Sequence, residues 1–198
     1  MNVVRTNEGD YKVWIDLKNG NREALEYIIN QYYSDLYFYG VKLSKKPEIS
    51  EDCIQEVLIT LWEKRNSLNT VYNLKSYLFK SLKRRIIRVL SAQKKEEAQQ
   101  ENLRGVSAEF SFSTEDKMIG QQETLENQQK LITALSKLSN RQKEIVYLKY
   151  YQGLNYDEIA EVMLLKRQSV HNLLQEAVKS LRKNFFCLGY QFSIEKIR

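Results

Sequence analysis

The sequence predicts an all-α protein built from two small helical domains that are joined by a flexible linker. The chain of 198 residues has only one proline and seven glycines, so few positions would interrupt a helix. Apolar side chains recur at helical spacing in two long stretches, and little of the sequence alternates as a strand does. Between these stretches, residues 96–124 are rich in Gln, Glu and Ser, a composition typical of a linker.

The first helical stretch, residues 5–95, is expected to begin with a short helix over residues 10–19. Asn21 can cap the next helix, because its side chain can accept a hydrogen bond from the first turn. One face of that helix is apolar, through Leu25, Ile28, Ile29, Tyr32, Leu36, Tyr39 and Leu43. Pro47 is expected to end this region, and Ser50 to cap the helix that follows.

The distribution of charged residues separates the chain into segments more clearly than the distribution of apolar residues does. Asn73 opens a helix in which residues 74–95 include eight Lys or Arg and no acidic residue. Residues 96–129 carry eight acidic and two basic side chains, a net charge of −6. We interpret this second segment as an acidic tether.

The second helical stretch, residues 125–185, has Asn140 as an expected cap and Gly153 as an expected helix stop. Near its end two short amphipathic helices follow one another, which fits a DNA-binding helix-turn-helix or a plain helical hairpin. A small residue, Ala160, stands where the helices would cross. The apolar anchors expected of a helix-turn-helix are present as Ile159, Met163, Leu165, Val170 and Leu173 or Leu174.

The turn has Leu164 where glycine is common, so either the backbone avoids a positive φ or the fold tolerates strain. Polar side chains at the start of the second helix can reach base edges and phosphates in a major groove. The predicted duplex-binding residues are Lys166, Arg167, Gln168, Ser169, His171, Asn172 and Gln175.

Other classes of protein are poorly supported by the sequence. Cys53 and Cys187 are far apart and His171 is the only histidine, so neither a disulfide scaffold nor a metal or other cofactor site is expected. GxSxG and phosphate-binding glycine loops are absent, which argues against an enzyme. With neither a signal peptide nor an apolar run of about 18 residues, we expect a cytoplasmic protein without membrane insertion.

The stretch "LSKLSNRQKEIVYLKYYQGLNYDEIAEVMLLKRQSVHNLLQEAVKSLRK" resembles region 4 of bacterial sigma factors. "EDCIQEVLITLWEKR" followed by "LKSYLFKSLKRRIIRVLSAQKK" resembles their region 2. With these two regions and a linker, the chain resembles an extracytoplasmic-function (ECF) sigma factor over about residues 10–184. The turn "LLKRQSVHNLL" is especially similar to members from Bacteroidetes-type bacteria.

The resemblance implies a role for each region. Region 2 would bind a coiled coil of the polymerase β′ subunit through Asp52, Gln55, Glu56 and Trp62, although an ordinary amphipathic helix with a solvated acidic face has the same pattern. The melted promoter −10 strand would be held by Asn66, Asn69, Asn73, Lys75, Lys80, Lys83, Arg84, Arg85 and Arg88. Unstacked bases could stack on Trp62, Tyr72 and Tyr77, of which Trp62 and Tyr77 also suit a core. Region 4 would hold the −35 duplex.

The resemblance also implies partners: core RNA polymerase (β and β′ subunits), promoter DNA and an anti-sigma factor, which is frequently membrane-bound. The acidic linker would occupy the cationic RNA-exit path of the polymerase, or it is simply a solvated spacer. Relatives often carry Asn and Asp where this chain has Arg84 and Arg88, which favours phosphate contact there over base recognition. The alternative function is a helix-turn-helix regulator without stable polymerase association, which would usually need a dimer.

Overall fold

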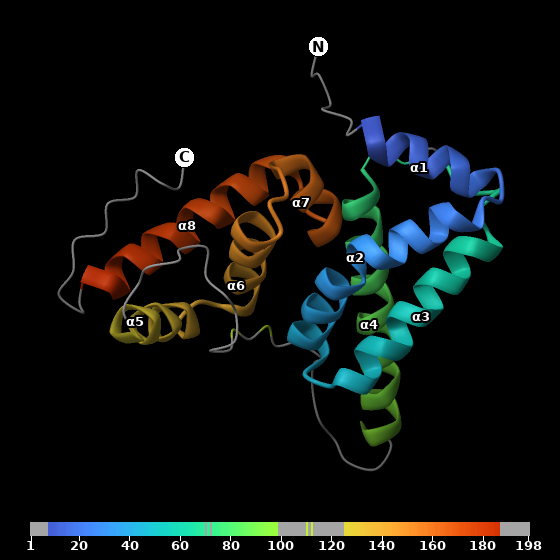
Figure 1. Cartoon of the computed structure of the whole chain (residues 1–198). Coiled ribbons are helices and arrows are strands. Elements are labelled where there is room, and N and C mark those ends of the chain that lie inside the picture. The colour runs from blue at the N-terminus through green and yellow to red at the C-terminus, as the bar shows by residue number, and fades with distance from the viewer. Residues whose placement is uncertain are drawn as a thin grey trace. The chain divides into compact units, whose positions relative to one another are not determined.

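The computed structural model describes residues 8–69, 71, 73–98, 110, 112 and 125–186, and these contain helices and no strand. They form two compact units (Figure 1). The predicted all-α fold class, with two helical domains, is therefore confirmed. The first unit consists of α1 (Glu8–Lys18), α2 (Arg22–Ser44), α3 (Pro47–Glu63) and α4 (Leu74–Ala98).

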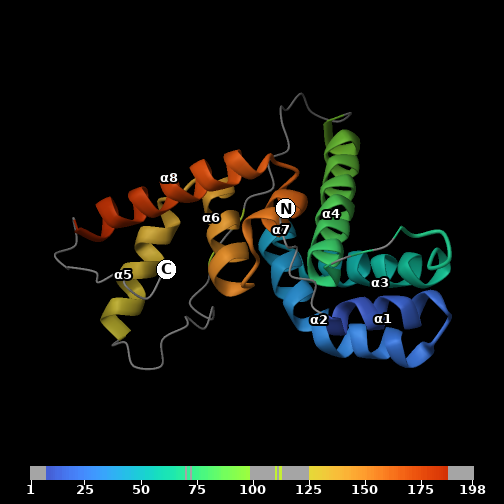
Figure 2. The same cartoon turned by 90° about the horizontal axis from the view of Figure 1, so that it is seen from above.

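The core of the first unit lies where α2 contacts α1, α3 and α4, and Figure 2 shows α4 crossing α3 steeply. Asn21 caps α2 as predicted, with its side-chain oxygen accepting from the Glu23 N–H at 2.9 Å. Most of the predicted apolar face is buried, but Leu25 and Ile29 are only half-buried. The largest fully buried side chains of this unit are Trp14, Leu17, Ile28, Leu36, Tyr39, Ile54, Leu61, Leu74, Leu78, Phe79 and Leu82.

The prediction that Ser50 caps α3 is wrong. The helix begins at Pro47, whose fixed φ and missing N–H suit the first helical position. Ser50 is fully buried inside the helix, where its hydroxyl donates to the Lys46 carbonyl at 3.1 Å. Its Cβ lies 3.0 Å from where a Cβ on Gly40 would stand, so the serine packs at a close crossing of α2 and α3.

The second unit contains Phe110 and Phe112 together with α5 (Leu125–Ser136), α6 (Asn140–Val146), the π-helical turn η1 (Tyr147–Tyr151), most of α7 (Tyr156–Met163) and α8 (Arg167–Phe186). The long helix α8 packs against α5 and α6. The expectation that Asn140 caps α6 is wrong, because Ser139 is the cap. A capping box joins Ser139 and Gln142: each side chain accepts a hydrogen bond from the other residue's backbone N–H.

Candidate functional site

A capped first helix and a sharp turn build the two-helix segment at the end of the chain. The Asn155 side chain accepts hydrogen bonds from the N–H groups of Asp157 and Glu158 at 2.9 and 3.0 Å, and the Glu158 carboxylate accepts from the Asn155 N–H. The turn is closed by the Leu165 N–H, which donates to the Ala160 carbonyl at 3.0 Å. Ile159 on α7 and Val170 on α8 are fully buried, as expected for the anchors of a helix-turn-helix.

Leu164 decides between the two turn geometries that the sequence left open. Its φ of 55° and ψ of 46° place it in the left-handed region, where a Cβ crowds the backbone. The side chain is 57% exposed, so its contacts offset that crowding only in part. The fold therefore tolerates a strained non-glycine residue at this turn.

The seven predicted duplex-binding residues around the start of α8 are all exposed, and they form one polar surface. The Gln168 amide donates to the Asn172 side-chain oxygen at 2.9 Å, and Arg167 pairs with Asp157 at 3.0 Å. Exposed contacts of this kind are weak, and water or a nucleic acid can replace them. The surface combines cations with amides, a combination suited to phosphates and base edges.

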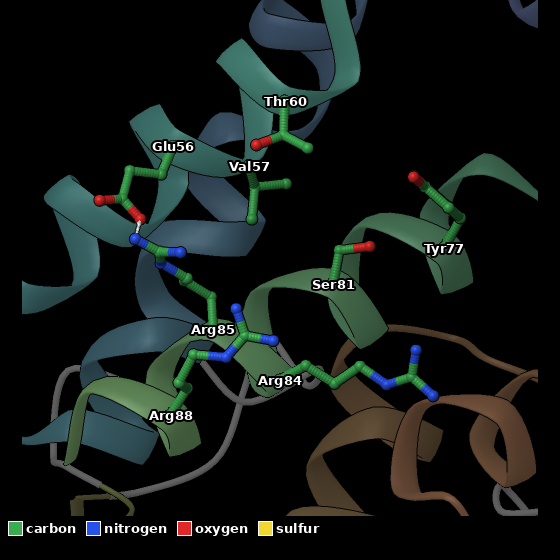
Figure 3. A pocket seen from close by; sticks show the side chains of 8 residues that line it. All are labelled: Glu56, Val57, Thr60, Tyr77, Ser81, Arg84, Arg85 and Arg88. Atoms are coloured by element: carbon green, nitrogen blue, oxygen red, sulfur yellow. Dashed lines mark ion pairs between the residues drawn. The ribbon is translucent and has the colours of Figure 1, made fainter. Parts of the chain in front are cut away.

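In the first unit, a groove between α3 and α4 is lined by Glu56, Val57, Thr60, Tyr77, Ser81, Arg84, Arg85 and Arg88. Figure 3 shows the Glu56 carboxylate on α3 paired with the Arg85 guanidinium on α4. Arg84 and Arg88 are exposed on the same helix. The groove thus presents cationic side chains beside hydroxyl groups, with one of its three arginines held by a carboxylate.

Three of the predicted polymerase-binding residues, Asp52, Gln55 and Glu56, are exposed on α3. Trp62 is half-buried, and the Arg65 guanidinium lies 4.3 Å from the centre of its ring. Because Glu56 pairs with Arg85, it belongs to the groove as well as to the exposed face of α3. The structure therefore brings together one predicted polymerase-binding residue and one predicted DNA-binding residue.

The residues predicted to hold the −10 strand occupy different environments. Asn66 and Asn69 are exposed on the loop after α3, whereas the Asn73 side-chain oxygen caps α4 by accepting from the Ser76 N–H at 2.7 Å. Lys75 pairs with Asp35 of α2 at 3.0 Å, and Lys80 and Lys83 are half-buried on α4.

Of the two tyrosines that are candidates for base stacking, the structure describes Tyr77. Tyr77 packs edge-on against the core residue Trp14, with ring centres 5.5 Å apart, and burial raises its pKa. Tyr72 lies outside the described residues. Tyr77 is thus partly a core residue, although it also lines the groove.

An aromatic cluster in the second unit was not predicted from the sequence. Phe110, from the segment interpreted as a tether, is 2% exposed and lies 5.4 Å from the Tyr147 ring centre. Phe112 lies 5.6 Å from the Tyr151 ring, and the two tyrosines stack at 5.3 Å across the π-helical turn. The only hint in the sequence was two phenylalanines in an otherwise polar segment. This part of the linker belongs to the second unit.

Among the described residues, no three His, Cys, Asp or Glu side chains come together in a way that could hold a metal ion. Cys53 is buried, and this burial raises the pKa of its thiol, although the nearby Arg85 charge acts in the opposite direction. Within the described part of the chain, no helix combines the length and apolarity needed to span a bilayer.

Comparison with known protein families gives two matches on this chain. Residues 28–96 match the family described as Sigma-70 region 2, and residues 128–181 match Sigma-70, region 4. The first match covers most of α2, together with α3, the loop and the basic helix. The second covers the helix-turn-helix. The fold and these two matches therefore define a sigma-70-type transcription factor that contains regions 2 and 4.

Individual relatives indicate the group of sigma factors to which the chain belongs. The chain is 22% identical over 184 residues to the ECF RNA polymerase sigma factor SigX of Bacillus subtilis (strain 168), covering 89% of this chain and 91% of that one. It is 20% identical to the ECF RNA polymerase sigma factor SigK of Mycobacterium sp. (strain JLS), covering 84% of each. Taken with the two regions, these likenesses show that the chain belongs to the ECF sigma factors.

Solved structures have the same fold. CnrH, in complex with the cytosolic domain of CnrY, superposes with a TM-score of 0.58 at 15% identity, covering 88% of this chain and 95% of that one. The sigma factor RpoE of Bartonella quintana, in complex with the anti-sigma factor NepR, gives a TM-score of 0.56 at 22% identity, covering 84% and 96%. The special similarity of the turn to Bacteroidetes-type members stays a prediction.

Proposed function

We propose that this chain binds core RNA polymerase and directs it to promoters, where it recognises the DNA and helps to melt it. The observation that supports this proposal is the presence, in order, of a region 2 match at 28–96 and a region 4 match at 128–181 on one chain. The proposed domains are residues 5–95 and 125–185, with an acidic linker at 96–124. Phe110 and Phe112 are the part of that linker that lies with the second domain.

The exposed face of α3 is the proposed polymerase contact. Asp52 and Gln55 are exposed there, and among the described residues neither makes an ion pair that would compete with polymerase binding. Glu56 does make such an ion pair, with Arg85. We therefore expect Asp52 and Gln55, with the half-buried Trp62, to contribute more to docking on the β′ subunit than Glu56 does.

The groove and the basic face of α4 are proposed to hold the melted −10 strand. Arg84 and Arg88 are exposed cations that can follow a phosphate backbone, and Asn66 and Asn69 carry exposed amides that can pair with an unstacked base. The polar surface at the start of α8 is proposed to hold the −35 duplex. Binding to the polymerase raises the effective concentration of both surfaces near DNA, so each can be weak alone.

The chain is proposed to supply recognition without catalysis, since phosphoryl transfer takes place in the polymerase. It would therefore act in the cytoplasm, where core polymerase meets the chromosome. Its acidic linker, with a net charge of −6 over residues 96–129, suits the cationic RNA-exit path of the enzyme. An anti-sigma partner is proposed as well, because the structural neighbour RpoE was solved in complex with the anti-sigma factor NepR, and CnrH in complex with the cytosolic domain of CnrY.

Gel filtration with core polymerase, followed by run-off transcription from a promoter library, tests the function. A 1:1 complex that initiates at defined start sites is the expected result. A protein that does not bind core polymerase, but protects a palindromic DNA site, would instead be a conventional helix-turn-helix regulator. That outcome would overturn the proposal.

The −10 surface is tested by neutralising exposed cations and measuring how binding depends on salt. Each phosphate contact to a single strand contributes about 0.7 to the slope of log K against log salt concentration. Arg84→Gln and Arg88→Gln should each lower the slope for a forked promoter probe by about that amount. Lys12→Gln is the matched control, because Lys12 is an exposed cation on α1. Arg85 is unsuitable for this test, since its loss would leave Glu56 unpaired in the groove. Unchanged slopes for both arginine variants would contradict the assignment.

A further inference from the structure

The first helix of the chain touches the loop that carries Asn66 and Asn69. The match to sigma-70 region 2 begins at residue 28, so α1 (Glu8–Lys18) precedes it. The Lys18 ammonium group, at the last position of α1, donates a hydrogen bond of 2.8 Å to the backbone carbonyl of Leu68. The two residues are 50 positions apart in the sequence, so this bond is a tertiary contact.

The loop that receives this bond is compact. The backbone N–H groups of Ser67 and Leu68 both donate to the Lys64 carbonyl, at 2.9 and 3.1 Å. The Ser67 hydroxyl donates to the same carbonyl at 2.9 Å. Leu68 stands directly before Asn69 and two positions after Asn66, so a bond to its carbonyl restrains the backbone between the two asparagines.

The turn after α1 also lies close to this loop. The Arg65 guanidinium lies over the Trp62 ring, 4.3 Å from its centre, and donates to the Trp62 carbonyl at 2.7 Å. A Cβ built on Gly20 would stand 3.7 Å from the Arg65 Nε. Gly20 has a φ of +83°, so the turn after α1 takes a conformation that glycine adopts without strain. The end of α1 is therefore bonded to the loop at Leu68, and the turn that follows α1 lies close to Arg65.

A loop that is already ordered captures a base at a lower free-energy cost than a loop that becomes ordered on binding. Flipping a base out of the stack has an unfavourable free energy, and ordering the loop at the same moment would add to it. Lys18 is half-buried, and its ammonium group donates a charge-assisted hydrogen bond that restrains the loop backbone. We propose that Lys18 is a positioning residue, which holds the Asn66 and Asn69 amides in place for an unpaired promoter base.

This inference rests on the proposed role of the loop in binding the −10 strand. The test uses the full chain bound to core polymerase and a forked promoter probe, with each of the four bases in turn at every unpaired −10 position. Lys18→Met should lower discrimination between the best and the worst base by about tenfold, a factor that corresponds to about 1.4 kcal/mol. Lys18→Arg, which can still donate to the Leu68 carbonyl, should restore most of it.

Lys12→Met is the matched control, because Lys12 lies on the same helix and is exposed. It should leave discrimination unchanged. Hydrogen exchange gives a readout without DNA: the Ser67 and Leu68 amides should exchange faster in Lys18→Met, while amides in the middle of α3 should not change. This second measurement also shows whether the variant is folded.

Three results would overturn the inference. Lys18→Met could keep full discrimination between bases. It could weaken binding equally for every base and lower the salt slope, which would make Lys18 a phosphate contact. It could also raise exchange throughout α3, which would make its role one of general stability. If the wild-type protein discriminates between bases, any of these results rejects the role of Lys18 alone. If the wild-type complex does not discriminate at all, the proposed −10 function of the loop fails first and the inference fails with it.

Discussion

Replacing Leu164 with alanine should destabilise the second unit more than replacing it with glycine. Leu164 has a φ of 55°, and a residue with a Cβ in this region has an unfavourable energy of about 1–2 kcal/mol. Glycine removes that strain, but it has about 0.5–1 kcal/mol more conformational freedom to lose on folding than alanine has. The balance favours glycine over alanine at this position by about 0.5–1 kcal/mol.

The wild-type leucine should lie close to the glycine variant. Its side chain is 57% exposed, so the apolar burial that leucine has and glycine lacks is about 1 kcal/mol, which is similar to the net advantage of about 0.5–1 kcal/mol that glycine has over alanine here. The effect of alanine and glycine at Leu164 is best compared with their effect at an ordinary helical position. At Lys179, which is exposed within α8, alanine should be more stable than glycine by about 1 kcal/mol. The order of glycine and alanine should therefore reverse between the two sites.

Thermal unfolding of the full chain, followed by circular dichroism, measures the effect. A difference of 1 kcal/mol shifts the midpoint of a domain of this size by about 4–8 °C. Both tryptophans, Trp14 and Trp62, lie in the first unit, so tryptophan fluorescence provides an internal control that should not shift. The reasoning is refuted if Leu164→Ala is as stable as Leu164→Gly. It is also refuted if the transition followed by tryptophan fluorescence shifts together with the transition followed by circular dichroism.

Asn155→Ala removes the cap of α7 and should destabilise the second unit by about 1 kcal/mol, measured by the same unfolding assay, whereas an unchanged midpoint would mean that the cap contributes nothing. Phe110→Ala should release Phe110's position from Tyr147, seen in NMR as a change in the chemical shifts of the Tyr147 ring when the ring current of Phe110 is removed, and unchanged Tyr147 shifts would contradict the contact. Burial raises the pKa of Cys53, so the folded state holds the thiol proton to higher pH than the unfolded state does. Stability from this group is therefore complete below the ordinary thiol pKa of 9.0 and falls as pH rises above it, and Cys53→Ala should make the decline in denaturation midpoint above about pH 9 shallower.

The local sequence pattern was enough to predict the helices and several of their ends. Asn21 was recognised as a cap because capping depends on a side chain and a backbone group two residues apart. Ser50 and Asn140 were assigned wrongly because serine and asparagine suit more than one position near a helix start. For Ser50 the choice was made by packing against Gly40, a residue of the preceding helix.

The sequence by itself determined the all-α class, the two helical stretches, the basic helix, the acidic linker and the polar surface of the helix-turn-helix. Tertiary structure alone decided that Glu56 pairs with Arg85, that Phe110 lies with the second unit and that Lys18 bonds to the Leu68 carbonyl. The physical reason is the separation, along the sequence, of the residues that interact. Helical periodicity, capping and charge depend on residues a few positions apart, whereas each of these contacts joins groups that only the packed chain brings close together.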